Sequence, residues 1–181
     1  GRKKGKSFAR LEQFQKYLVP PSKDFFKQIE KPRVLEIGIG DGEKISTDAK
    51  LYSKINYIGC DIFADGVLRA IRNSKENSLK NLFVFHLNVQ DILSFIPAKY
   101  FDGIRVFFPD PWPKTKHKRR RTFNSELVQT LSSKLKKNGY IHFATDHGDY
   151  FLDALVLLQD QDFRMDNILS LIHISEPTRP S

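Results

Sequence analysis

The sequence contains almost no cysteine, and this scarcity excludes several classes of protein. Cys60 is the single cysteine of the chain, so no disulfide can form within it and no zinc site can be built from cysteines alone. No apolar run is long enough to span a bilayer, and no apolar segment follows the basic N-terminus as in a secretory signal. We therefore expect a protein of the reducing cytoplasm that does not span a membrane.

The spacing that metal sites and hydrolase sites require is also missing. The histidines share no regular spacing with cysteine or with carboxylates, so the sequence predicts no metal site. Ser7, Ser125 and Cys60 lack the neighbouring base and the sharp turn of a nucleophilic hydrolase. Both classes of enzyme are disfavoured.

What the chain does have is positive charge and enough apolar content for a core. Its 181 residues, 40% of them hydrophobic, fit one domain of ordinary size. The net charge is +9, and basic residues are concentrated in residues 2–10 and 114–121. This charge favours an anionic partner such as a nucleic acid. We expect five aromatic residues to pack in the core rather than to stack on bases: Phe25, Phe26, Phe83, Phe85 and Tyr100.

Strand-like and helix-like segments alternate along the chain. Apolar runs rich in β-branched residues predict strands at residues 33–37, 56–61, 82–87, 103–108 and 140–145. Amphipathic segments predict helices at residues 43–51, 66–77, 92–96, 124–136 and 150–159. The pair Asn138-Gly139 predicts the end of a helix before a strand. The sequence therefore predicts an α/β fold with a mostly parallel sheet, helices on both faces, and ligands at the carboxyl ends of the strands.

A glycine-rich loop after the first predicted strand indicates a nucleotide-type ligand. In the run EIGIGDG, which begins at Glu36, the residues Gly38 and Gly40 permit a tight turn and a close approach of a ligand to the backbone. The dinucleotide motif would have a third glycine where Glu43 stands, and the acidic loop disfavours a pyrophosphate. An uncharged or cationic ligand such as S-adenosylmethionine (AdoMet) fits better. A structural turn without a ligand is the alternative.

Acidic residues follow each of the later predicted strands. Asp61 ends the second strand, where its carboxylate can accept hydrogen bonds from both ribose hydroxyls or can cap the next helix. Asp91 follows the third strand, and either meets an adenine edge or caps the short helix behind it. Asp110 and Asp146 follow the fourth and fifth strands, so we expect both carboxylates at one crevice.

The segment FFPDPWPKTKHKRRR, residues 107–121, combines a stiff backbone with dense positive charge. Its three prolines fix φ and remove donors, so Asp110 and Trp112 are expected in a rigid, extended stretch. The cations of residues 114–121 are expected to stay solvated and to bind an anion such as RNA phosphate, with a plain surface loop as the alternative. Trp112 either stacks on a base or packs beneath the loop.

Four motifs in this order, LEIGIGDG, YIGCDIFADGV, FFPDPWPKTKHKRRR and HFATDHGDY, resemble the bacterial tRNA (guanine-N7-)-methyltransferase family. The resemblance runs from about residue 1 to about residue 163. It implies a Rossmann-like class I AdoMet-dependent methyltransferase of the cytoplasm, with tRNA as its partner and a monomer or homodimer as its assembly. The implied reaction is transfer of a methyl group from AdoMet to N7 of a guanosine in the variable loop of tRNA.

The resemblance also implies roles for single residues. The positions that match the family's AdoMet-binding residues are Glu36, Gly38, Asp61, Asp91 and Asp110. Asp110 also matches the family's proposed catalytic residue, and Lys114 and Asp146 match substrate-binding positions. We expect Arg120 and Arg121 of the basic run to bind tRNA phosphates.

The departures from the family lie mainly at the C-terminal end. We expect a basic arm and leading helix in residues 1–30, the methyltransferase domain in residues 31–165, and a non-native tail in residues 166–181. The family's Thr-x-x-Glu segment and last strand are not found, and residues 168–174 are apolar enough to pair as a substitute edge strand. Two other hypotheses remain open. One is an AdoMet-dependent methyltransferase of another RNA or a small molecule, and the other is a catalytically impaired tRNA-binding fragment.

Overall fold

The computed structural model describes residues 20–164, which divide into two compact units. Unit 1 comprises residues 20–107 and 133–142, and unit 2 comprises residues 108–132 and 143–164. Residues 1–19 of the predicted basic arm and leading helix lie outside the described residues, as does the predicted non-native tail with its substitute edge strand.

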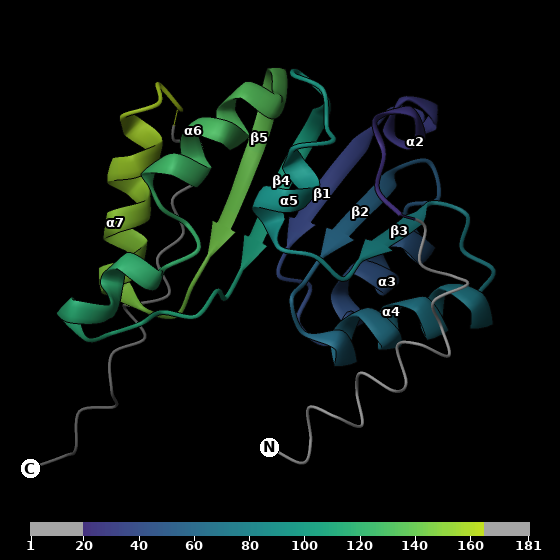
Figure 1. The fold of residues 1–181 in the computed structure, drawn as a ribbon, viewed down its shortest axis with the longest axis horizontal. Helices are drawn as coiled ribbons and strands as arrows, with labels where there is room; N and C mark the ends of the chain where they lie inside the picture. The colour runs from purple at the N-terminus through teal and green to yellow at the C-terminus, as the bar shows by residue number, and fades with distance from the viewer. Residues whose placement is uncertain (1–19, 165–181) are drawn as a thin grey trace, which may run out of the picture. The chain divides into compact units, whose positions relative to one another are not determined.

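A five-stranded parallel sheet forms the centre of unit 1 (Figure 1). The strands are β1 (Arg33–Ile37), β2 (Asn56–Cys60), β3 (Leu82–Phe85), β4 (Phe101–Phe107) and β5 (Leu135–Ala144), whose last two residues belong to unit 2. Their order across the sheet is β3-β2-β1-β4-β5. The chain thus moves outward from β1 to β3 and returns to the other side of β1, which makes a switch point between β1 and β4. The predicted α/β fold with a parallel sheet is confirmed.

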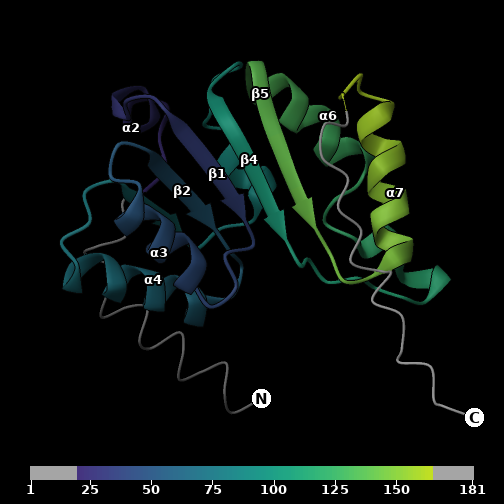
Figure 2. The same ribbon diagram turned by 180° about the vertical axis from the view of Figure 1, so that it is seen from behind.

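Helices cover both faces of the sheet in unit 1. These helices are α2 (Lys23–Gln28), α3 (Glu43–Leu51), α4 (Ala64–Glu76) and α5 (Val89–Leu93). Figures 1 and 2, which view the molecule from opposite sides, show α3 and α4 together on one face and α5 on the other. Residues Phe83 and Phe85 of β3 contact Phe25 of α2, whereas Leu82 belongs to the core under α3 and α4. Because strand side chains alternate between faces, α2 lies on the face opposite α3 and α4.

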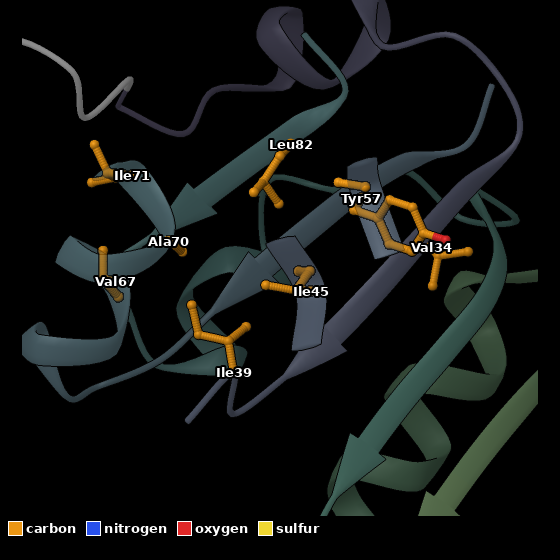
Figure 3. Packing of buried hydrophobic residues seen from close by; sticks show 9 residues of the cluster. Val34, Ile39, Ile45, Tyr57, Val67, Ala70, Ile71 and Leu82 are labelled. Carbon is orange, nitrogen blue, oxygen red and sulfur yellow. The ribbon is translucent and has the colours of Figure 1, made fainter. Parts of the chain in front are cut away.

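Each face of the sheet has its own packed core. Under α3 and α4 the buried cluster comprises Val34, Ile39, Ile45, Ala49, Tyr57, Val67, Ala70, Ile71 and Leu82 (Figure 3). On the other face, the ring centroid of Phe26 lies 5.6 Å from that of Phe85 and 6.1 Å from that of Tyr100. Phe25 meets Phe26 and Phe83 edge-on at 5.4 and 5.6 Å. The prediction of core packing is confirmed for Phe26, Phe85 and Tyr100, which are buried, whereas Phe25 and Phe83 are half-buried.

Unit 2 contains the proline-rich segment and three helical elements. These are the 3₁₀-helix η2 (Thr115–Arg120), α6 (Ser125–Lys134), whose last two residues belong to unit 1, and α7 (Gly148–Gln159). Phe123 and Phe143 pack with ring centroids 4.7 Å apart, and Tyr150 meets Phe143 edge-on at 5.4 Å. These aromatic rings give unit 2 a small core.

The predicted helix end at Asn138-Gly139 is wrong. Helix α6 ends at Lys134, and both residues lie within β5. Asn138 has a φ of 66°, a left-handed conformation that asparagine tolerates better than most residues. A Cβ on Gly139 would lie 2.9 Å from Leu135 Cδ2 and 3.0 Å from the Lys136 carbonyl oxygen. The pair therefore shapes an irregular start to a strand instead of ending a helix.

Candidate functional site

The loop between β1 and α3 exposes its backbone where a ligand could approach. Gly38 and Gly40 have φ values of 71° and 58°, and a Cβ at either position would meet no atom within 4 Å. The Gly38 N–H donates to the Cys60 carbonyl at 2.9 Å, which fixes the loop at the end of β2. At Gly42 a Cβ would lie only 2.6 Å from the Gly66 carbonyl oxygen. The loop is therefore closely packed at its α3 end and open at Gly38 and Gly40.

Asp61 holds this loop through its side chain. Only 7% of its surface is exposed, and its carboxylate accepts the Gly40 N–H at 3.0 Å and the Phe63 N–H at 2.8 Å. The N-cap of α4 is Phe63, so the alternative in which Asp61 caps that helix is wrong. Each carboxylate oxygen can accept a further hydrogen bond, and ribose binding by Asp61 stays a prediction.

Asp91 is exposed in the first turn of α5. The N-cap of this helix is Asn88, whose side chain accepts the Gln90 N–H at 3.1 Å. The alternative in which Asp91 caps the helix is therefore wrong, and its predicted adenine contact stays a prediction.

Glu36 is a buried carboxyl group with unused hydrogen-bonding capacity. It is 2% exposed, and among the residues described its Oε2 atom has no hydrogen-bond partner. Burial raises the pKa of Glu36 to about 7, although Arg105, its register neighbour on β4, acts in the opposite direction. A positively charged ligand group would satisfy this carboxylate.

Arg105 and Asp48 form a charged pair beside Glu36 that the sequence patterns did not indicate. Arg105 Nη1 donates to Asp48 Oδ2 at 2.6 Å, and Lys44 Nζ donates to the same oxygen at 2.5 Å. The sequence does contain one indication of this pair: Arg105 is a charged residue within an otherwise apolar predicted strand, and a buried charge needs a partner. A cavity of about 310 Å³ lies next to this pair, lined by Lys44, Asp48, Tyr52, Ile55, Tyr57, Arg105, Phe107 and His142.

In unit 2, the segments that carry Asp110 and Asp146 are joined by a backbone hydrogen bond. The Phe108 N–H donates to the Ala144 carbonyl at 2.8 Å, and each aspartate lies two residues beyond this bond. Both carboxylates are exposed. The two segments are therefore neighbours, and a shared crevice for the two acids and their roles stay predictions.

The proline-rich segment is not uniformly extended, contrary to the prediction. Phe108 and Trp112 have φ values of 47° and 42°. The chain then turns into η2, whose N-cap is the exposed Lys114. Arg120 lies over the Trp112 ring at 5.0 Å, and His117 meets that ring edge-on at 5.9 Å. Trp112 therefore packs within its own segment, which agrees with the alternative of a packing role.

Arg121 differs from the solvated phosphate contact that was predicted. It is 4% exposed, its Nε donates to the Pro111 carbonyl at 2.8 Å, and its guanidinium pairs with Asp153 of α7. The guanidinium also lies 4.5 Å from the Tyr150 ring centroid. The Nη2 atom of Arg121 is buried and has no hydrogen-bond partner among the described residues. The expectation that the whole run stays solvated is therefore wrong at Arg121, and its phosphate contact stays a prediction.

The predicted site residues are divided between the two units. Unit 1 carries Glu36, Gly38, Asp61 and Asp91, and unit 2 carries Asp110, Lys114, Arg120, Arg121 and Asp146. Within residues 20–164, no three His, Cys, Asp or Glu side chains gather as a metal site would require. The helices of this same range are too short or too polar to cross a membrane.

Comparisons with known proteins agree on methyltransferases. The family model described as "Putative methyltransferase" matches residues 30–171. A "Bifunctional methyltransferase" of Rickettsia prowazekii is 35% identical over 99% of this chain and 34% of its own length. A "tRNA (guanine-N(7)-)-methyltransferase" of Thiobacillus denitrificans is 37% identical over 82% of this chain and 66% of its own length. The chain thus spans about a third of the Rickettsia relative and about two thirds of the Thiobacillus one.

Solved structures of methyltransferases share the fold. A "SAM dependent methyltransferase from Aquifex aeolicus" superposes with a TM-score of 0.57 at 17% identity, over 86% of this chain and 80% of that one. An "Antibiotic Related Methyltransferase" gives 0.59 at 22% identity, over 82% and 78% of the two chains. At these identities the comparison supports a common architecture.

Proposed function

Because this chain belongs to the bacterial tRNA (guanine-N7-)-methyltransferase family, we propose that it transfers a methyl group from AdoMet to N7 of a guanosine in the variable loop of tRNA. The observation that carries the proposal is the family match over residues 30–171, which includes both the glycine loop and the proline-rich basic segment. We also propose a cytoplasmic location, where its tRNA substrate would be met.

The residues of unit 1 fit AdoMet. The loop is open at Gly38 and Gly40, so the backbone there can approach a ligand closely. Among residues 20–164, Glu36 has a buried oxygen without a hydrogen-bond partner, and a cationic N–H donor of the ligand would satisfy it. Asp61 keeps acceptor capacity for ribose hydroxyls after its two backbone contacts. We assign the cofactor to these residues together with Asp91 and Asp110.

The proposed chemistry needs no general base on the protein. Bound AdoMet supplies an electrophilic methyl group on a sulfonium. Guanine N7 already carries an in-plane lone pair, so the protein has to align that atom and balance the positive charge that develops on the guanine. Asp110 is exposed between two prolines that stiffen its backbone. We assign it to this charge balance or to hydrogen bonds with the guanine, with Lys114 and Asp146 as substrate contacts.

The exposed cations of the basic run would hold tRNA phosphates. Lys114, Lys116, Arg119 and Arg120 are exposed, and each phosphate that they neutralise should make the slope of log affinity against log salt more negative by about 0.7 to 0.9. We call the magnitude of this slope the salt slope.

Methyl transfer from labelled AdoMet to unmodified tRNA tests the proposal directly. Digestion of the product to nucleosides should yield labelled 7-methylguanosine. Label in a different nucleoside would favour a methyltransferase of another specificity, and tRNA binding without any label would favour an impaired tRNA-binding fragment.

A further inference from the structure

Two of the basic residues in the segment 114–121 are bound to α7. Lys118 Nζ lies 2.8 Å from Asp149 Oδ2 and 3.7 Å from Asp153 Oδ2. Arg121 pairs with Asp153, and its Nη2 lies 3.7 Å from Asp149 Oδ2. We call these four side chains the anchor. It contains two cations and two carboxylates, so its net charge is zero.

The sequence spacing explains why these four side chains meet. A 3₁₀-helix has three residues per turn, so Lys118 and Arg121, its C-cap, lie one above the other. Asp149 and Asp153 are four residues apart on α7, where side chains of one face are neighbours. The hydrogen bond with Asp149 raises the pKa of Lys118, and Lys118 lowers the pKa of Asp149. Both groups are therefore charged at neutral pH.

Neighbouring contacts fix the buried end of the anchor. Besides its bond to the Pro111 carbonyl, Arg121 lies over the ring of Tyr150, and the Tyr150 hydroxyl accepts the Phe123 N–H at 2.9 Å. The Asn124 side chain donates to the Arg121 carbonyl at 3.1 Å. Arg121 thus joins the proline-rich segment, the end of η2 and α7.

Three other cations of η2 have no such role. Lys116, Arg119 and Arg120 are exposed, and we call them the outer cations. Without the anchor, the exposed parts of Asp149 and Asp153 would place negative charge next to them and would repel phosphate. Pairing with Lys118 and Arg121 neutralises these carboxylates and holds η2 against α7.

We propose that the anchor positions the outer cations for RNA phosphates and touches no phosphate itself. Asp149 and Asp153 are then positioning residues for the substrate, although they are acids beside an RNA-binding surface. This inference rests on the proposed function, because it concerns how the same chain holds tRNA.

Charge reversal within the full chain tests the anchor. Lys118→Asp should weaken tRNA binding about tenfold, because it breaks one ion pair and adds repulsion from Asp149. Adding Asp149→Lys restores the pair with opposite polarity, but it also places the new lysine beside Arg121 and the new aspartate beside Asp153. The affinity should therefore recover in part, to within about threefold of the original. The salt slope of the double variant should also return toward that of the unaltered chain. In both variants the KM for tRNA should change in parallel with the tRNA affinity, while kcat stays unchanged.

A matched control tests whether Asp149→Lys restores tRNA binding through the ion pair or only by adding positive charge to the surface. Arg119→Asp removes an outer cation, so it should lower the salt slope by about 0.7 to 0.9, and Asp149→Lys should not restore it. Circular dichroism checks that each variant is folded. If Lys118→Asp does not fold, Lys118→Gln replaces it and should leave the salt slope unchanged, whereas Arg119→Gln should lower it.

The outcomes distinguish this inference from the proposed function. If the double variant stays as weak as Lys118→Asp in a chain that binds and methylates tRNA, Lys118 contacts phosphate and only the anchor proposal is overturned. The anchor proposal is likewise overturned if Lys118→Gln lowers the salt slope as Arg119→Gln does. If the unaltered chain shows no salt-dependent tRNA binding, the proposed function fails, and the anchor proposal fails with it.

Discussion

Replacing Glu36 with glutamine should change how the stability of the protein depends on pH. Glu36 is almost completely buried, and its pKa is raised from 4.5 to about 7, mainly by burial. A carboxyl group whose pKa is higher in the folded state favours folding below its unfolded pKa, and this contribution is lost as the pH rises through about 7. Since one pKa unit corresponds to about 1.4 kcal/mol, ionised Glu36 costs the folded state about 3 kcal/mol above this range.

Urea denaturation followed by circular dichroism measures the effect. Between about pH 5 and about pH 8, the free energy of unfolding of the unaltered chain should fall by about 2.5 kcal/mol more than that of Glu36→Gln. The test compares how the free energy of unfolding changes with pH in the two proteins, and not its absolute value at one pH. A buried amide without partners adds a cost of about 1 to 3 kcal/mol that does not depend on pH. Glu76→Gln, at an exposed position of α4, is the matched control and should follow the unaltered chain.

AdoMet should reduce this pH effect. A cationic ligand at Glu36 favours the ionised carboxylate, so added AdoMet should stabilise the unaltered chain more at about pH 8 than at about pH 5. Parallel pH profiles for the unaltered chain and Glu36→Gln without ligand would refute the reasoning, because they would show that Glu36 ionises in the folded protein as easily as in the unfolded one.

The other predictions concern the glycine loop and the acids around it. Gly66→Ala should destabilise the fold by about 3 kcal/mol despite the helix preference of alanine, because its Cβ would lie 1.7 Å from the Gly40 carbonyl oxygen. Gly38→Ala has open space and should cost only about 1 to 2 kcal/mol of backbone strain, and urea denaturation compares the two. Asp61→Ala should lower the free energy of unfolding by about 3 kcal/mol even without AdoMet, since it loses two backbone hydrogen bonds; an effect seen only with ligand would contradict this loop-holding role. Asp110→Asn should lower turnover far more than AdoMet affinity in steady-state kinetics and calorimetry, and equal losses would assign it to cofactor binding.

Strands β1, β2 and β3 could be predicted from the sequence because each is a short apolar run followed by a glycine, an aspartate or a histidine. Residues 33–37 and 43–51 were predicted with the bounds that the structure has for β1 and α3. The start of β5 was missed by five residues, since Asn138-Gly139 has the local signature of a helix end. The left-handed conformation of Asn138 matches that local preference, but the strand on either side of it depends on pairing with β4. Tertiary context decides such cases.

The acids at the strand ends could also be located from the sequence, whereas the partners of each charge could not. Spacing places Asp61 after β2, but does not reveal that its carboxylate already holds Gly40. The basic run indicates an anion-binding surface, but two adjacent arginines of this run differ in solvent exposure. Arg120 is exposed, and Arg121 is buried against α7. The difference arises from Asp153, which lies more than thirty residues away in the chain. Charge patterns in a sequence do not specify such long-range pairs.

The most direct test of the proposed function is AdoMet-dependent methyl transfer to two unmodified tRNAs that differ only in the variable loop, one with guanosine at the target position and one with adenosine. We predict label on the guanosine tRNA alone, recovered as 7-methylguanosine. Equal label on both tRNAs, or no label on either from a chain that is folded and binds AdoMet, would contradict the proposed function.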